Sequence, residues 1–158
     1  MREVFQKELA EVQGRLVEIA ESVTHIIKDA TEAFTTSNAL LAEREIGMAE
    51  SNESNALALD ELVIRILSRQ SPVARDLRIL VSALRISASL ERMGALAGHI
   101  AAIARYRFPG SAIPASLVGT FEEMGRLDVE LASKVTELLR NTNVDQAREI
   151  QAQDERID

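Results

Sequence analysis

The sequence predicts an all-α protein built as a bundle of long antiparallel helices, and three observations support this. Residues that favour helices are abundant, whereas aromatic residues make up only 3% of the chain and Trp is absent. Only seven glycines and three prolines interrupt the 158 residues. Apolar residues recur at alternating spacings of four and three, the spacing of a helix that buries one face. Helices are therefore expected over nearly the whole chain.

The first helix is predicted over residues 5–34, where one apolar stripe runs from end to end. Its members are Phe5, Leu9, Val12, Leu16, Ile19, Val23, Ile26, Ala30 and Ala33. At a rise of 1.5 Å per residue, such a helix would be roughly 45 Å long, which is typical of a bundle rod. Residues 35–38 then supply the polar side chains of a turn and of a helix N-cap.

The second helix is predicted over residues 39–68, with an apolar seam that is polar in its middle. The seam begins with Leu41 and Met48, but Asn52 and Asn55 occupy its middle positions. These amides would fix the register of neighbouring helices, line a metal site or mark a partner contact. Register is the default interpretation, because polar seam residues commonly have this role.

The third helix is expected to start at Ser71 and Pro72, since proline is tolerated in a first turn, and to reach about residue 106. It carries two apolar stripes, which predicts a central place touching several neighbours. One comprises Leu77, Leu80, Leu84 and Ala88, and the other comprises Ile79, Ile86, Leu90, Met93, Ala97 and Ile100.

Proline and glycine break the chain at residues 108–114, and a fourth helix is predicted over residues 115–140, with a fifth from residue 144. Comparing the chain with itself at an offset of 105 residues aligns Asn38 with Asn143 and Ala42 with Ala147. We therefore expect a complete first repeat over residues 1–108, a linker at 109–114, and a partial second repeat over 115–158 that looks truncated.

Composition and missing motifs exclude several classes of function. The net charge of −7 opposes nonspecific binding to nucleic acid, and the absence of cysteine excludes disulfides and thiolate metal sites. No segment resembles a secretory signal or a membrane span, so a cytoplasmic protein without membrane insertion is expected.

There is no Gly-rich phosphate loop and no recognisable catalytic triad, and the Glu-x-x-His pairs of a di-iron bundle do not occur around His25 or His99. A histidine-kinase dimerisation helix around His25 is disfavoured because Ile26 and Ile27 follow where an acidic residue would be expected. The sequence therefore predicts a binding protein and not an enzyme.

Two segments of the third helix carry a recognisable pattern. Residues 70–78 read QSPVARDLR, and residues 90–94 read LERMG. The chain resembles the PhoU family, in which a Q-x-P-V-A-x-D-L-R segment precedes an L-E-R-I-G-D-H-A segment within repeated three-helix bundles; Ala95 resembles an actinobacterial branch. The resemblance implies a cytoplasmic negative regulator of the phosphate-starvation response and of phosphate transport. Such a protein would be an adaptor between a Pst-type ABC phosphate transporter and a sensor histidine kinase. Without this pattern, periodicity alone would equally support a helical scaffold with no phosphate role.

The resemblance also implies metal binding, because family members carry carboxylate pairs one helical turn apart that can bind a divalent or iron ion. Here Ala49 and Ala95 replace two of those acidic positions, so no cofactor is certain. The remaining candidate ligands are Asp154, Asp158, Glu50, Glu53 and Glu91. For Asp154 and Asp158, the alternative is a pair of solvated carboxylates.

Candidate partner-binding residues open the third helix. Arg75, Asp76 and Arg78 form a charged cluster that would dock a transporter or kinase subunit, although an intrahelical charge network explains it equally well. A homodimer is also expected, because a truncated second repeat would leave an apolar groove to cover.

Overall fold

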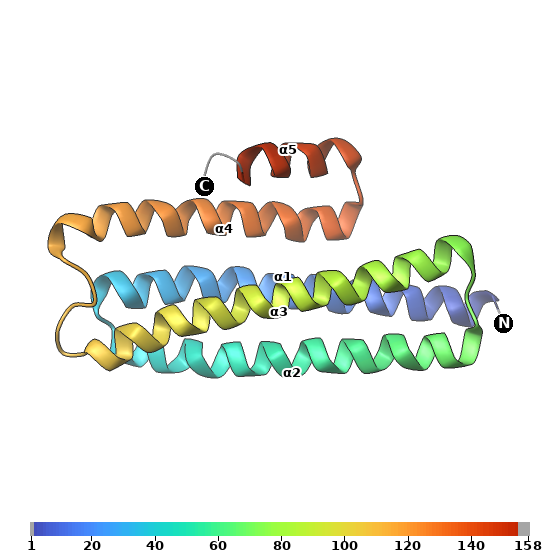
Figure 1. The fold of residues 1–158 in the computed structure, drawn as a ribbon, viewed down its shortest axis with the longest axis horizontal. Helices are drawn as coiled ribbons and strands as arrows, with labels where there is room; N and C mark the ends of the chain where they lie inside the picture. Colours follow the sequence, from blue (N-terminus) through green and yellow to red (C-terminus); the bar gives the residue numbers. More distant parts are fainter. Residues whose placement is uncertain (1, 155–158) are drawn as a thin grey trace.

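The computed structural model describes residues 2–154 and contains five α-helices and one 3₁₀ turn, with no strand in that range. Figure 1 shows that long helices that follow one another in the chain run antiparallel, so the prediction of an all-α bundle is confirmed. The elements in chain order are α1 (Arg2–Thr36), α2 (Ala39–Gln70), α3 (Ala74–Arg107), η1 (Ala115–Leu117), α4 (Val118–Asn141) and α5 (Val144–Asp154). None of these helices is long and apolar enough to cross a membrane.

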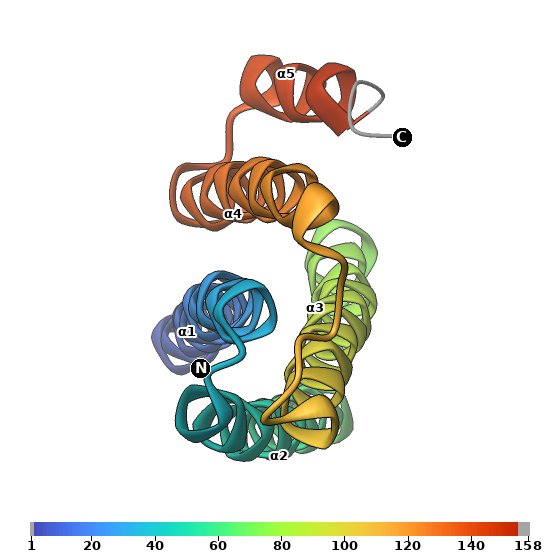
Figure 2. The same cartoon turned by 90° about the vertical axis from the view of Figure 1, so that its left-hand side faces the viewer.

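Helices α1, α2 and α3 form a three-helix bundle, which Figure 2 shows end-on. Its core is apolar along most of its length because each helix contributes aliphatic residues at helical spacing. The stripe predicted for the first helix is buried except for the partly buried Leu9. Burial of these side chains is the main stabilisation of the bundle.

Two asparagines open helices in the same way. The side-chain oxygen of Asn38 accepts a hydrogen bond from the Leu41 amide at 3.0 Å and caps α2. The side-chain oxygen of Asn143, which precedes α5, accepts from the amides of Asp145 and Gln146 at 2.9 and 3.4 Å. The pairing of Asn38 with Asn143 at an offset of 105 residues thus has a structural counterpart, while the division into repeats stays a prediction.

Helix α3 starts two residues later than expected, so the placement of Pro72 in its first turn was wrong. Ser71 ends α2 in a left-handed conformation with φ 43°, and Val73 is extended with φ −124° before the helix begins. Pro72 therefore lies in the connection, where its lack of an amide donor leaves no helical hydrogen bond unmade.

The central helix is α1 and not α3, contrary to the prediction. Helix α1 contacts α2, α3 and α4, whereas α3 contacts α1 and α2 only. The second apolar stripe of α3 stays partly open, with Ile79 and Ile100 exposed by 42% and 40%. The reason is that α4 stacks on α1, as Figure 2 shows, and so leaves that side of α3 uncovered.

Small residues let the helices approach closely. A side chain on Gly98 of α3 would lie 2.7 Å from the Cβ of Ala49 of α2, and one on Gly94 would lie 2.7 Å from Asn52 Nδ2. At these two glycines the backbone of α3 therefore comes closer to α2 than any larger residue would allow.

Candidate functional site

The predicted partner-binding residues lie at one end of the bundle, in the first turns of α3. Arg75 and Arg78 are exposed and form no ion pair with other residues in the range 2–154, and Asp76 is half-buried. Asp76 lies in the first turn of α3, where its negative carboxylate interacts favourably with the positive end of the helix dipole. Gln70 has a different role, because its Nε2 donates to Glu8 Oε2 at 3.3 Å and ties α2 to α1.

The candidate metal ligands of the first repeat do not gather into a three-residue cluster. Glu50 and Glu53 are exposed on α2, and Glu91 is half-buried on α3. Ala49, which stands where the family pattern has an acidic residue, packs against Gly98. The backbones of α2 and α3 are therefore held together there by two small residues.

Asp154, at the end of α5, lies near Asp128 of α4. The pKa of Asp128 is raised mainly by partial burial of its carboxyl group. The negative charge of Asp154 is the second cause. Two carboxylates close enough to affect each other in this way could share a cation. Asp158, the predicted partner of Asp154, lies outside the described residues.

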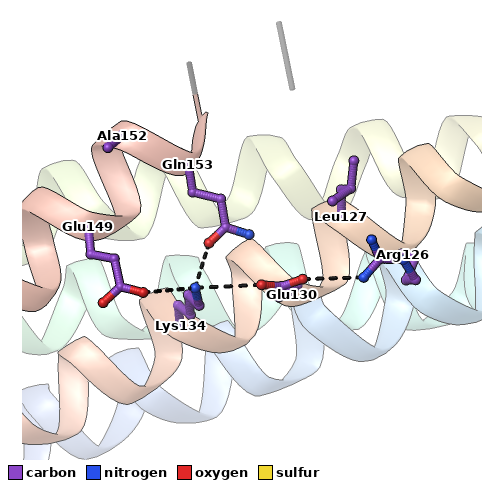
Figure 3. A pocket seen from close by; sticks show the side chains of 7 residues that line it. All are labelled: Arg126, Leu127, Glu130, Lys134, Glu149, Ala152 and Gln153. Atoms are coloured by element: carbon purple, nitrogen blue, oxygen red, sulfur yellow. Dashed lines mark hydrogen bonds and ion pairs between the residues drawn. The ribbon is translucent and has the colours of Figure 1, made fainter. Parts of the chain in front are cut away.

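Helices α4 and α5 enclose a charged pocket, shown in Figure 3. Lys134 lies at its centre and donates to Gln153 Oε1 at 2.6 Å and to Glu149 Oε1 at 3.1 Å. The hydrogen bond to Glu149 is the main reason why the pKa of Lys134 is raised. Glu130 lies between Lys134 and Arg126, and its pKa is lowered first by the hydrogen bond from Gln153 and then by these two cations. Positive and negative groups therefore neutralise one another within the pocket.

A second charged cluster, formed by His25, Asp29, Arg44 and Glu45, joins α1 to α2 and was not predicted. His25 and Asp29 are one turn apart on α1, and His25 Nε2 lies 3.2 Å from Asp29 Oδ2. Arg44 bridges the helices, with Nη2 2.6 Å from Asp29 Oδ2 and Nε 2.9 Å from Glu45 Oε1. The cluster is therefore a bridge between two core helices.

Burial of this cluster is uneven. The side chain of Glu45 is 0% exposed and that of Asp29 is 10% exposed, whereas those of His25 and Arg44 are exposed by 55% and 59%. The hydrogen bond to Glu45 is the main reason why the pKa of Arg44 is raised. Glu45 Oε2 is enclosed without a hydrogen-bond partner among the described residues. Two buried carboxylates thus share one cation that lies mostly at the surface.

The amides in the middle of α2 differ from the prediction. Asn55 is exposed and does not belong to the seam, whereas Asn52 is fully buried. Neither Oδ1 nor Nδ2 of Asn52 has a hydrogen-bond partner among the described residues. Asn52 therefore does not set helix register through a side-chain hydrogen bond.

Within residues 2–154 the chain is thus an all-helical bundle whose candidate sites are charged surfaces and carboxylate clusters. The family model described as "PhoU domain" matches residues 16–104. Phosphate-specific transport system accessory protein PhoU homolog 2 of Mycobacterium tuberculosis is 36% identical over 158 residues, which are 100% of this chain and 74% of the relative. PhoU homolog 1 of Mycobacterium leprae is 34% identical over 100% of the chain and 71% of the relative. PhoU of Escherichia coli is 27% identical over 98% of the chain and 63% of the relative.

The chain belongs to the PhoU family. The resemblance seen in residues 70–78 and 90–94 is thereby confirmed, and so is the likeness to actinobacterial members, since the mycobacterial relatives are more similar than that of Escherichia coli. All three relatives are named accessory proteins, which agrees with the prediction of a non-enzymatic protein.

Proposed function

We propose that the protein is a cytoplasmic negative regulator of the phosphate-starvation response and of phosphate transport. It would act as an adaptor between a Pst-type ABC phosphate transporter and a sensor histidine kinase. Membership of the PhoU family supports this proposal, as do the names of the relatives, which are accessory proteins of phosphate-specific transport systems.

The observation that carries the adaptor role is the exposure of the segment over residues 70–78. Gln70 serves the bundle through its contact with Glu8, but Val73 is 75% exposed, and Arg75 and Arg78 are also exposed. Side chains that the core does not need, in the segment that marks the family, are suited to recognising a partner. Two exposed guanidinium groups that form no ion pair within residues 2–154, beside an exposed apolar residue, fit a partner surface with carboxylates around an apolar spot.

The proposal is tested by phosphatase activity in cells grown with ample phosphate. Deletion of the gene should make the activity constitutive, and the wild-type gene should restore repression. The Arg75→Glu/Arg78→Glu variant should fail to restore it, because reversing two charges repels the partner surface. Arg85→Glu on α3 is the matched control, since Arg85 is also exposed, outside the ion pairs of residues 2–154 and outside both segments that mark the family. It should restore repression fully.

Thermal unfolding of the purified variants separates recognition from folding. Both should unfold within about 2 °C of the wild type, because exposed substitutions change stability little. Unchanged phosphatase activity in the deletion strain would instead favour the generic helical scaffold, once paralogous genes have been deleted too.

We also propose a homodimer. One exposed apolar side of α3 supports this, because Leu96, Ile100 and Ile103 recur at spacings of four and three residues and are exposed by 50%, 40% and 48%, so they form a stripe. A second copy packed on this stripe would cover it in a two-fold arrangement. Light scattering should give twice the monomer mass at micromolar concentration, and Ile100→Glu should give the monomer mass. A wild-type monomer across that range would rule the dimer out.

A further inference from the structure

The cluster between α1 and α2 has the donors of a metal site. One ligand atom each from His25, Asp29 and Glu45 can be chosen so that all lie within 4.8 Å of one another. The donors are one imidazole nitrogen and two carboxylates, a set that suits borderline divalent cations such as Zn²⁺ or Mn²⁺. None of the three belongs to the acidic residues that the family resemblance marks as ligands.

The buried carboxylate of Glu45 favours a cation in this cluster. Its side chain is 0% exposed, Oε1 accepts from Arg44, and no described residue donates to Oε2. An enclosed carboxylate oxygen with no donor is costly, because it has lost water without gaining a partner. A cation within the cluster would remove that cost.

Charge balance gives the same result. Asp29 and Glu45 bring two carboxylates to the cluster, and the Arg44 guanidinium is the one permanent cation that contacts both of them. A divalent ion in place of the guanidinium would neutralise both carboxylates. Arg44 can leave, because its side chain is 59% exposed and reaches the cluster from the surface.

The distances fit a single ion. Ligands bound tetrahedrally to Zn²⁺ at their usual bond lengths are about 3.3 Å apart, and His25 Nε2 lies 3.2 Å from Asp29 Oδ2. The ligand atoms of all three residues lie within 4.8 Å of one another, and the 55% exposed side chain of His25 leaves the cluster open to solvent on one side. We propose that His25, Asp29 and Glu45 bind one divalent transition-metal ion, which replaces Arg44 and bridges α1 to α2.

Zn²⁺ and Mn²⁺ titrations of the metal-free protein by calorimetry test the proposal. The wild type should bind one ion per chain, and His25→Gln should weaken binding by about tenfold or more, because it removes the only nitrogen ligand. His99→Gln is the matched control, since His99 is an exposed histidine of α3 outside the cluster. Equal affinity in the wild type and His25→Gln would overturn the proposal, as would the absence of binding.

Arg44→Ala distinguishes a metal site from a purely structural ion-pair bridge. Both interpretations expect a lower Tm for this variant without metal, because the buried carboxylates lose their cation. A metal site further predicts that Zn²⁺ restores the Tm of Arg44→Ala and binds it more tightly than the wild type, since the competitor is gone. A structural bridge predicts no recovery. Arg85→Ala, at an exposed arginine of α3, should show neither effect. These outcomes do not depend on the proposed role in phosphate regulation.

Discussion

Thr31 of α1 occupies the space that a side chain on Gly125 of α4 would need. A Cβ atom at Gly125 would lie 2.3 Å from Thr31 Cγ2 and 2.5 Å from its hydroxyl oxygen. The hydroxyl donates to the Ile27 carbonyl at 2.7 Å, which holds the threonine side chain in place. Nearby, the rings of Phe34 and Phe121 pack edge to face, with 5.3 Å between the ring centroids. Together these contacts fix how closely α4 approaches α1.

Gly125→Ala should therefore destabilise the protein by about 1–3 kcal/mol, because the added methyl group forces α4 away from α1. Urea denaturation measures this loss. Gly14→Ala is the control, since a Cβ at Gly14 meets nothing within 4 Å. That variant should gain about 0.5–1 kcal/mol from helix propensity alone. A neutral or stabilising Gly125→Ala would mean that α4 does not dock as described.

Asn52→Leu should leave stability unchanged or raise it by about 1 kcal/mol, because it replaces an enclosed amide by an apolar group of similar shape. Asn52 lies against Val23 and Gly94 in the core. Asn55→Leu, at an exposed position on the same helix, should change little. A loss above about 2 kcal/mol in Asn52→Leu would show that the amide has a polar partner after all. Urea unfolding of both variants decides this.

Asp128→Asn should raise the Tm at neutral pH. The folded state raises the pKa of Asp128 through burial and the charge of Asp154, so ionised Asp128 destabilises the fold above that pKa. The effect fades as pH falls through the raised pKa, because the protonated carboxyl no longer carries the penalty. Asp154→Asn should reproduce part of the gain by removing the second cause. Tm scans across the acid range measure both, and a Tm gain that grows toward low pH would contradict the argument.

Lys134→Met should loosen α5 without unfolding the bundle. Helix α5 has no buried residue and is held to α4 partly by the contacts of Lys134 with Glu149 and Gln153. Hydrogen exchange in α5 should become several-fold faster in the variant, while that of α1 stays the same. Lys28→Met, at an exposed lysine of α1, is the control. Equal exchange in α5 for both variants would show that apolar contacts alone hold this helix.

The sequence predicted the helices well because their signals are local. The spacing of apolar residues predicted the buried stripe of α1. The N-cap residues Asn38 and Asn143 indicated where α2 and α5 begin. It failed on the central helix, since two apolar stripes on α3 do not reveal which of them another helix covers. That depends on where α4 packs, a tertiary contact between residues far apart in the chain.

The cluster around Glu45 was missed for a related reason. A glutamate in a helix rich in charges normally faces water, so Glu45 attracted no interpretation. One signal was present: Ala42, Glu45, Asn52, Ala56 and Leu59 follow one another at spacings of three, seven, four and three residues, and all are buried. Taking these residues as the buried seam of α2, in place of the seam through Leu41 and Met48, would have placed Glu45 in the core. The partners Asp29 and His25 could not be assigned, because the sequence of neither helix shows which side of α1 packs against which side of α2.

The central place of α1 has a consequence for synthesis on the ribosome. This helix precedes α2, α3 and α4 in the chain, yet all three pack on it. Its apolar faces are thus translated before the helices that cover them. The face that contacts α4 is covered only when residues up to Asn141 have emerged. Until then part of the apolar surface of α1 stays exposed to water.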